Sequence, residues 1–166
     1  MKTTTLLSTV GVSLLLSVQA AALPLVVTGF EYPGSPTTAR IQNGSPAVNA
    51  NVYAGGFLTD AGGNSFTSWC VDIFQHTHFG QTVNDYALTD GATALGAGRA
   101  DALGRLATQS LASVSNAASS GAFQLAIWEI VNETSGNPYS LTSGNFRTSS
   151  VSNGSLALAQ GWLDNL

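Results

Sequence analysis

The sequence predicts an α+β fold, in which an antiparallel β-sheet or barrel carries an inserted or appended helical region. Two observations lead to this class. Short apolar runs separated by turn residues fill the first half of the chain, a pattern typical of strands. After Asp90, apolar residues recur at intervals of three and four, the spacing of an amphipathic helix.

Three segments of the first half are predicted as strands: residues 23–30, 52–58 and 66–74. Residues 31–36 and 60–64 are rich in Gly, Pro, Asn and Asp, and we expect turns there, the second as a hairpin connection. Alternate residues of a strand point to opposite faces. Both faces of 66–74 carry large apolar groups, so this strand is expected to be central in its sheet.

Three later segments are predicted as helices: one from residue 99 onward, one over 119–133 and one over 156–166. The second is the strongest prediction, because Phe123 and Ile130 belong to an apolar stripe and Ser119 or Ser120 can cap its start. Residues 135–138 supply helix breakers after it. The last stretch reaches Leu166 without a stop signal, as expected of a domain that is incomplete at its C-terminus.

The first residues are typical of an export signal. Lys2 is followed by an apolar run and then by small residues around Ala20, so residues 1–22 are predicted to be a removable signal peptide. The remaining residues, 23–166, suit a single domain. The apolar run is short for a membrane span, and we expect no transmembrane segment after signal cleavage. The mature protein is therefore expected to be secreted, or to lie at the cell surface or in the extracellular matrix.

The composition excludes some partners. Only 8% of residues are charged, the formal net charge is −4, and no basic cluster occurs, which argues against binding to nucleic acid or to anionic lipid. The surface is expected to be neutral and rich in hydroxyl groups. Lys2 is the only lysine, so the chain without its signal peptide has no side-chain amine that could attack an acyl group.

One cysteine is unusual in an exported chain, where cysteines normally occur in pairs. We predict that Cys70 forms an internal thioester with Gln124, in which the thiolate displaces ammonia from the side-chain carboxamide. Such a bond lasts only where water is excluded, and Trp69, Ile127 and Trp128 are expected to shield it. An amine or hydroxyl on a target would then attack the carbonyl carbon and remain attached to Gln124.

Two motifs carry a family resemblance. Residues 69–71 read Trp-Cys-Val, an aromatic-Cys-apolar strand, and residues 124–128 read Gln-Leu-Ala-Ile-Trp. Together they resemble the thioester domains of bacterial surface adhesins, in the form seen in exported PEP-CTERM-type proteins of Gram-negative bacteria. The resemblance covers residues 52–133 and implies a β-rich fold with a helical insertion, a link between Cys70 and Gln124, and an adhesive role. The chain departs from that pattern because it has no PEP-type tail and no cell-wall anchor motif.

The residues leave other interpretations open. The alternative is that Cys70 is a buried, unpaired small side chain in a non-covalent matrix or surface structural protein. It is also compatible with a Cys-His hydrolase in which His76 or His78 is the base. Cys70, Asp72 and the two histidines are ligand types that zinc accepts, but a structural site needs four ligands at recognisable spacing, so neither metal nor cofactor is predicted.

The favoured interpretation is a covalent adhesion module that reacts once and is not a turnover enzyme. Its target is expected to be an amine on a surface protein or a hydroxyl on a polysaccharide. The sequence does not choose between these two nucleophiles.

Overall fold

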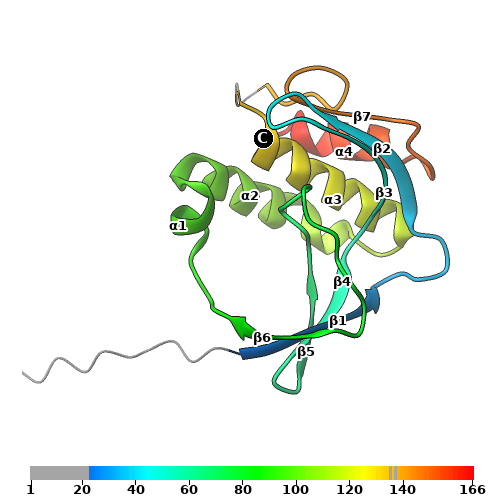
Figure 1. The fold of residues 1–166 in the computed structure, drawn as a ribbon. Helices are drawn as coiled ribbons and strands as arrows, with labels where there is room; N and C mark the ends of the chain where they lie inside the picture. Colours follow the sequence, from blue (N-terminus) through cyan, green and yellow to red (C-terminus); the bar gives the residue numbers. More distant parts are fainter. Residues whose placement is uncertain (1–22, 135, 137) are drawn as a thin grey trace, which may run out of the picture.

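The computed structural model describes residues 23–166 apart from 135 and 137 (Figure 1). The signal peptide predicted for residues 1–22 lies outside the described residues. The fold is α+β, as predicted, and is built from two antiparallel sheets and four α-helices. Neither sheet closes on itself, so of the two predicted forms the open sheet is observed and the barrel is not.

The first sheet consists of β5 (Asn64–Ser68), β4 (Phe57–Ala61), β1 (Leu23–Phe30) and β6 (Thr82–Tyr86), hydrogen-bonded in that order. Its edge strands are poorly covered: every residue of β6 is exposed, and Phe66 of β5 is also exposed. In Figure 1, β1 and β6 lie at the opposite end of the molecule from the helices. This sheet therefore leaves one part of the molecule open to solvent.

The second sheet consists of β3 (Val48–Ala54), β2 (Thr37–Asn43) and β7 (Phe146–Ser149), in that order. Thr37, Ala39, Ile41 and Asn43 of β2 are buried, while Thr38 and Arg40 between them are exposed. This period of two is that of a strand with one face on the core. The buried face packs against the central helix.

The helices are α1 (Gly91–Leu95), α2 (Ala97–Ser110), α3 (Ala117–Asn132) and α4 (Ser155–Leu163), with a 3₁₀ turn over Leu111–Ser113. Helix α3 is the centre of the fold and contacts α2, α4 and all strands of the second sheet (Figure 1). Its residues from Ser119 to Ile130 are all buried. A helix that is buried on every side needs no single apolar stripe, and apart from Gln124 and Glu129 the buried residues of this segment are apolar or small.

The start of α3 differs slightly from the prediction. Asn116 caps it by accepting a hydrogen bond from the Ser119 N–H, and the Ser119 hydroxyl returns to the Asn116 backbone. Ser119 is thus the second member of a capping box and not the cap itself. Ser120 instead accepts a hydrogen bond from the Gly56 N–H at 2.8 Å, which ties the connection between the two sheets to α3.

Two strand predictions were wrong. The segment 52–58 is not one strand, because Gly55 and Gly56 separate β3 and β4, which belong to different sheets. The strand predicted over 66–74 ends at Ser68 and lies at an edge of its sheet. It ends there because the backbone of Cys70 pairs with a side chain of α3 and not with another strand.

The chain also contains elements that the sequence did not predict, namely β2, β6, β7 and α1. Within the part of the chain that the structure describes, no helix combines the length and hydropathy needed to cross a membrane.

Candidate functional site

The structure brings Cys70 and Gln124 into direct contact. The Cys70 N–H donates a hydrogen bond to Oε1 of Gln124 at 3.0 Å, and Nε2 of Gln124 donates to the Cys70 carbonyl at 2.7 Å. The carboxamide therefore pairs with the Cys70 main chain in the way that a neighbouring strand would. Gln124 is 1% exposed, so its carboxamide is held in place and removed from bulk water.

Two elements create this contact. Gln124 lies in the first half of α3, whose packing on every side immobilises it. Cys70 lies just beyond the end of β5, where Trp69 packs on Phe123 with ring centroids 5.0 Å apart. Each aromatic residue is the chain neighbour of one member of the pair. The edge-to-face contact of Trp69 with Phe123 thus helps to hold the two segments side by side.

The thiol of Cys70 donates a hydrogen bond to the Asp72 carbonyl at 3.0 Å. Burial raises its pKa, and the nearby Asp72 carboxylate raises it further, since a second negative charge disfavours the thiolate. A hydrogen bond with the Asp72 backbone and the indole N–H of Trp128 act in the opposite direction. The net effect is a thiol that is protonated at neutral pH.

Trp128 is 5% exposed, and its Nε1 has no hydrogen-bond partner in the described part of the chain. Ile127 is 6% exposed and belongs to the core around α3. The predicted shielding role is thus compatible with the burial of both side chains. Trp128 alone of the two has an electrostatic effect on Cys70.

A cavity of about 530 Å³ adjoins Cys70 and extends under the first sheet. Its walls come from β1, β4, β6 and the chain between Ser68 and Gln81. We call it the Cys70 cavity. Its lining combines aliphatic, aromatic, hydroxyl and amide side chains with Asp72 and two histidines, and neither lysine nor arginine is among the residues that form it. A molecule that enters the cavity therefore meets apolar side chains and uncharged polar groups, with the Asp72 carboxylate close to Cys70.

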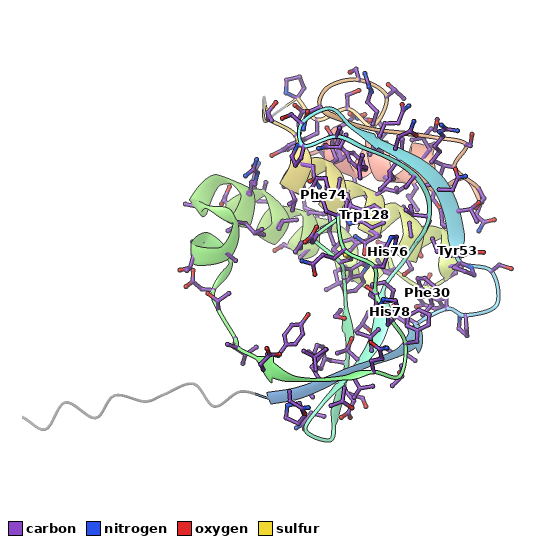
Figure 2. All side chains as sticks on the ribbon, viewed as in Figure 1. Phe30, Tyr53, Phe74, His76, His78 and Trp128 are labelled. Carbon is purple, nitrogen blue, oxygen red and sulfur yellow. The ribbon has the colours of Figure 1, made fainter. Side chains whose placement is uncertain are left out.

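His76 and His78 are exposed and line the same cavity, on the long connection between β5 and β6. Figure 2 shows this connection with both imidazoles, and Trp128 on α3. In the part of the chain that the structure describes, neither imidazole hydrogen-bonds to the thiol, whose donor bond goes to Asp72. Among the same residues, no group of three or more His, Cys, Asp or Glu side chains is arranged to hold a metal ion.

Two acidic side chains that received no role from the sequence are buried at the end of α3. Glu129 is completely buried; its Oε1 accepts a hydrogen bond from the Ser140 N–H at 2.8 Å, and its Oε2 has no partner among the described residues. Burial raises the pKa of Glu129 to about 8. The hydrogen bond from the Ser140 N–H acts to lower this pKa, and the nearby Glu133 carboxylate acts to raise it. Glu129 is therefore mostly protonated at neutral pH.

Glu133 accepts hydrogen bonds from the backbone of Thr134 and Asn145. Together these acids hold the segment after α3 against the helix. The sequence shows that both acids follow the 124–128 motif, but it does not predict that they are buried.

The sequence also did not predict the part of the Cys70 cavity wall that β6 and the residue before it form. Gln81 and Tyr86 line it, and β6 contributes because it pairs with β1. Since all of β6 is exposed, its sequence has no alternation of buried and exposed positions that would reveal a strand. No family model, curated protein or solved structure gives a significant match to this chain.

Proposed function

We propose that this protein is an exported adhesion module in which Cys70 and Gln124 form an internal thioester that acylates a nucleophile on a target surface. The observation that supports this most directly is the pair of hydrogen bonds between the Gln124 carboxamide and the Cys70 backbone. A buried glutamine, held beside a single cysteine at the edge of a cavity, has the parts that the reaction needs.

Formation of the bond is a balanced acyl transfer. The thiol loses its proton, the thiolate attacks Cδ of Gln124, and the negative charge that develops on Oε1 faces the Cys70 N–H. The C–N bond then breaks, and Nε2 leaves as ammonia with the proton from the thiol. No oxidant or cofactor is required. Before attack, the thiol must release its hydrogen bond to the Asp72 carbonyl.

In the attachment step, the Cys70 sulfur is the leaving group and no longer the nucleophile. A nucleophile that reaches the carbonyl through the Cys70 cavity attacks Cδ, forms an amide or ester with Gln124, and releases the thiol of Cys70. The low exposure of Gln124 limits competing hydrolysis on its inner side. The absence of lysine after residue 2 removes side-chain amines that would consume the thioester within the chain.

Intact mass of the protein tests this proposal. The mature protein is expected to be lighter than its sequence by one molecule of ammonia, to resist thiol reagents, and to gain one molecule of methylamine together with a titratable thiol. Cys70→Ala and Gln124→Ala should each abolish both the deficit and the uptake of methylamine. A full sequence mass, with a thiol that titrates as soon as the protein is denatured, would contradict the proposal.

One observation favours a second candidate, a Cys-His hydrolase: His76 and His78 line the same cavity as Cys70. In the described residues, however, the thiol bonds to a backbone carbonyl and not to an imidazole. The same mass measurement separates the two candidates, because a hydrolase keeps its full mass and forms a transient acyl-enzyme with an added ester substrate.

A further inference from the structure

One side of the Cys70 cavity, which we call the sheet wall, is a part of the first sheet that the core does not cover. Leu25 and Val27 lie two positions apart on β1, so they point to the same face of the sheet, and they pair with Val83 of β6 and Thr59 of β4. Neither Leu25 nor Val27 belongs to the buried core or to the partly buried side chains packed against it. Apolar surface on the sheet wall is therefore available to a ligand.

Another side of the cavity, which we call the connection wall, is polar and comes from the chain between β5 and β6 (Figure 2). Its polar side chains line the cavity, are exposed, and form no side-chain hydrogen bond within the described residues: Gln75, His76, Thr77, His78 and Gln81. Hydroxyl, amide and neutral imidazole groups can each donate and accept hydrogen bonds. The connection wall therefore offers donors and acceptors that the fold itself does not use.

An aromatic ring on β6 also lines the cavity. Tyr86 is 50% exposed and takes part in none of the ring pairs of the described residues. The other two rings of the lining already have ring partners, since Phe57 packs on Phe30 and Trp69 packs on Phe123. The ring of Tyr86 is therefore free to stack on a ligand, with its hydroxyl as a polar group at one end.

The charges of the lining argue against several classes of ligand. Neither lysine nor arginine lines the cavity, so a phosphate or carboxylate group would find no strong cationic partner there. A lysine side chain would depend on Asp72, whose Oδ1 already accepts the Phe74 N–H at 2.7 Å, and would leave the connection wall unused. A lipid tail would bury the polar groups of the connection wall without partners, which is unfavourable.

We propose that the Cys70 cavity is a binding site for a neutral oligosaccharide. A sugar ring has an apolar face of C–H groups, which fits the sheet wall and the Tyr86 ring. The hydroxyl groups around its edge donate and accept hydrogen bonds, as the connection wall does. The cavity volume of about 530 Å³ lies in the usual range for small-molecule sites.

Binding of the oligosaccharide does not require the thioester. One consequence rests on the proposed function: the nucleophile is then a sugar hydroxyl and not a protein amine. The hydroxyl oxygen attacks Cδ of Gln124, the C–S bond breaks, and the hydroxyl proton passes to the Cys70 sulfur. The products are an ester of Gln124 and a free thiol.

Binding is measured in a Cys70→Ala background, which cannot form a thioester, so the result does not depend on the proposed function. Isothermal titration calorimetry uses cellohexaose, maltohexaose and chitohexaose as neutral probes, with hexagalacturonate and hexalysine as charged probes. At least one neutral probe is expected to bind more tightly than both charged probes. Tighter binding of a charged probe, or no binding of any neutral probe, would overturn the proposal.

Tyr86→Ala in the same background tests where the neutral probe binds. Loss of the ring should weaken binding by about tenfold, a usual effect of removing one aromatic contact. Tyr53→Ala is the matched control, because Tyr53 is 60% exposed and lies on β3 of the second sheet, outside the cavity (Figure 2). Equal affinities of the two variants would place the probe elsewhere and contradict the proposal.

Amide chemical shifts locate the site if Tyr86→Ala does not fold. Addition of the neutral probe should shift the backbone amide resonances of residues 75–86 and leave those of α4 in place. Shifts confined to the second sheet or to the helices would overturn the proposal. An oligosaccharide that binds here, while the wild-type protein shows no ammonia deficit, supports the binding site and contradicts the proposed function, so the two failures are distinguishable.

Discussion

At the scale of single residues, the reactivity of Cys70 depends on a few neighbours with opposite effects. Its own N–H polarises the Gln124 carbonyl, while burial and the Asp72 carboxylate hold its thiol in the neutral form. A thiol with a raised pKa reacts slowly with external electrophiles, because only the thiolate is nucleophilic. In the proposed function, this protects the thiol from other electrophiles before it reacts with the Gln124 carboxamide.

The contribution of Asp72 is testable by Asp72→Asn in a Gln124→Ala background. Asparagine keeps the side-chain oxygen that accepts the Phe74 N–H at 2.7 Å, so the local turn should survive. Because the carboxylate raises the thiol pKa, its removal should lower that pKa and move the onset of iodoacetamide alkylation to lower pH. Asp60→Asn is the control and should change nothing, since Asp60 lies in β4 and its side chain likewise accepts a backbone hydrogen bond, from the Gly63 N–H. An unaltered profile for Asp72→Asn would refute this account.

At the scale of elements, the position of α3 determines where Gln124 lies. Gly121, one turn before Gln124, faces Thr37 of β2, and a Cβ at position 121 would overlap the side chain of Thr37. Thr37 cannot easily move, since its hydroxyl bonds to the Ala117 carbonyl and to the Ser155 hydroxyl, and the residue is fully buried. The close approach of helix and sheet therefore requires glycine at this position.

Two glycine substitutions test this packing. Gly121→Ala should destabilise the protein by roughly 1–3 kcal/mol, the usual effect of forcing extra volume into a packed core. Gly104→Ala in α2 is the control: nothing lies within 4 Å of the added Cβ, and the higher helix propensity of alanine should stabilise the protein by about 0.5–1 kcal/mol. Urea denaturation measures both changes. Equal effects of the two substitutions would contradict the packing described for α3.

At the scale of the whole molecule, a Cys70–Gln124 bond would join the open first sheet to the helical core. The two residues are 54 positions apart in the chain. Cross-linking a loop of this length removes chain entropy from the unfolded state, with an effect of about 4 kcal/mol by the usual loop-closure relation. The proposed bond would therefore stabilise the fold as well as store acyl reactivity.

Thermal unfolding before and after methylamine treatment tests this stabilisation. The intact thioester protein is expected to melt roughly 10 °C above the methylamine-opened form, from the loop entropy and the usual relation between free energy and Tm for a chain of this size. The Cys70→Ala variant, which keeps both hydrogen bonds between the Cys70 main chain and Gln124, should melt near the opened form and should not respond to methylamine. No difference in Tm between the closed and opened proteins would show that the bond does not restrain the unfolded chain.

The sequence by itself determined the α+β class, the strand over residues 23–30 and the buried helix that carries Gln124. These follow from local patterns, namely alternation, apolar spacing and turn residues. Cys70 and Gln124 were also chosen from the sequence alone, through two short motifs, and the structure places their groups in hydrogen-bonding contact.

Only the tertiary structure decided that the strand predicted over 66–74 stops at Ser68, because a side chain of α3 takes the place of a neighbouring strand. It also decided the walls of the Cys70 cavity and the burial of the two acids after Trp128. These features depend on contacts between residues far apart in the chain. Local periodicity carries no information about such contacts, since burial and pKa are set by neighbours that folding brings together.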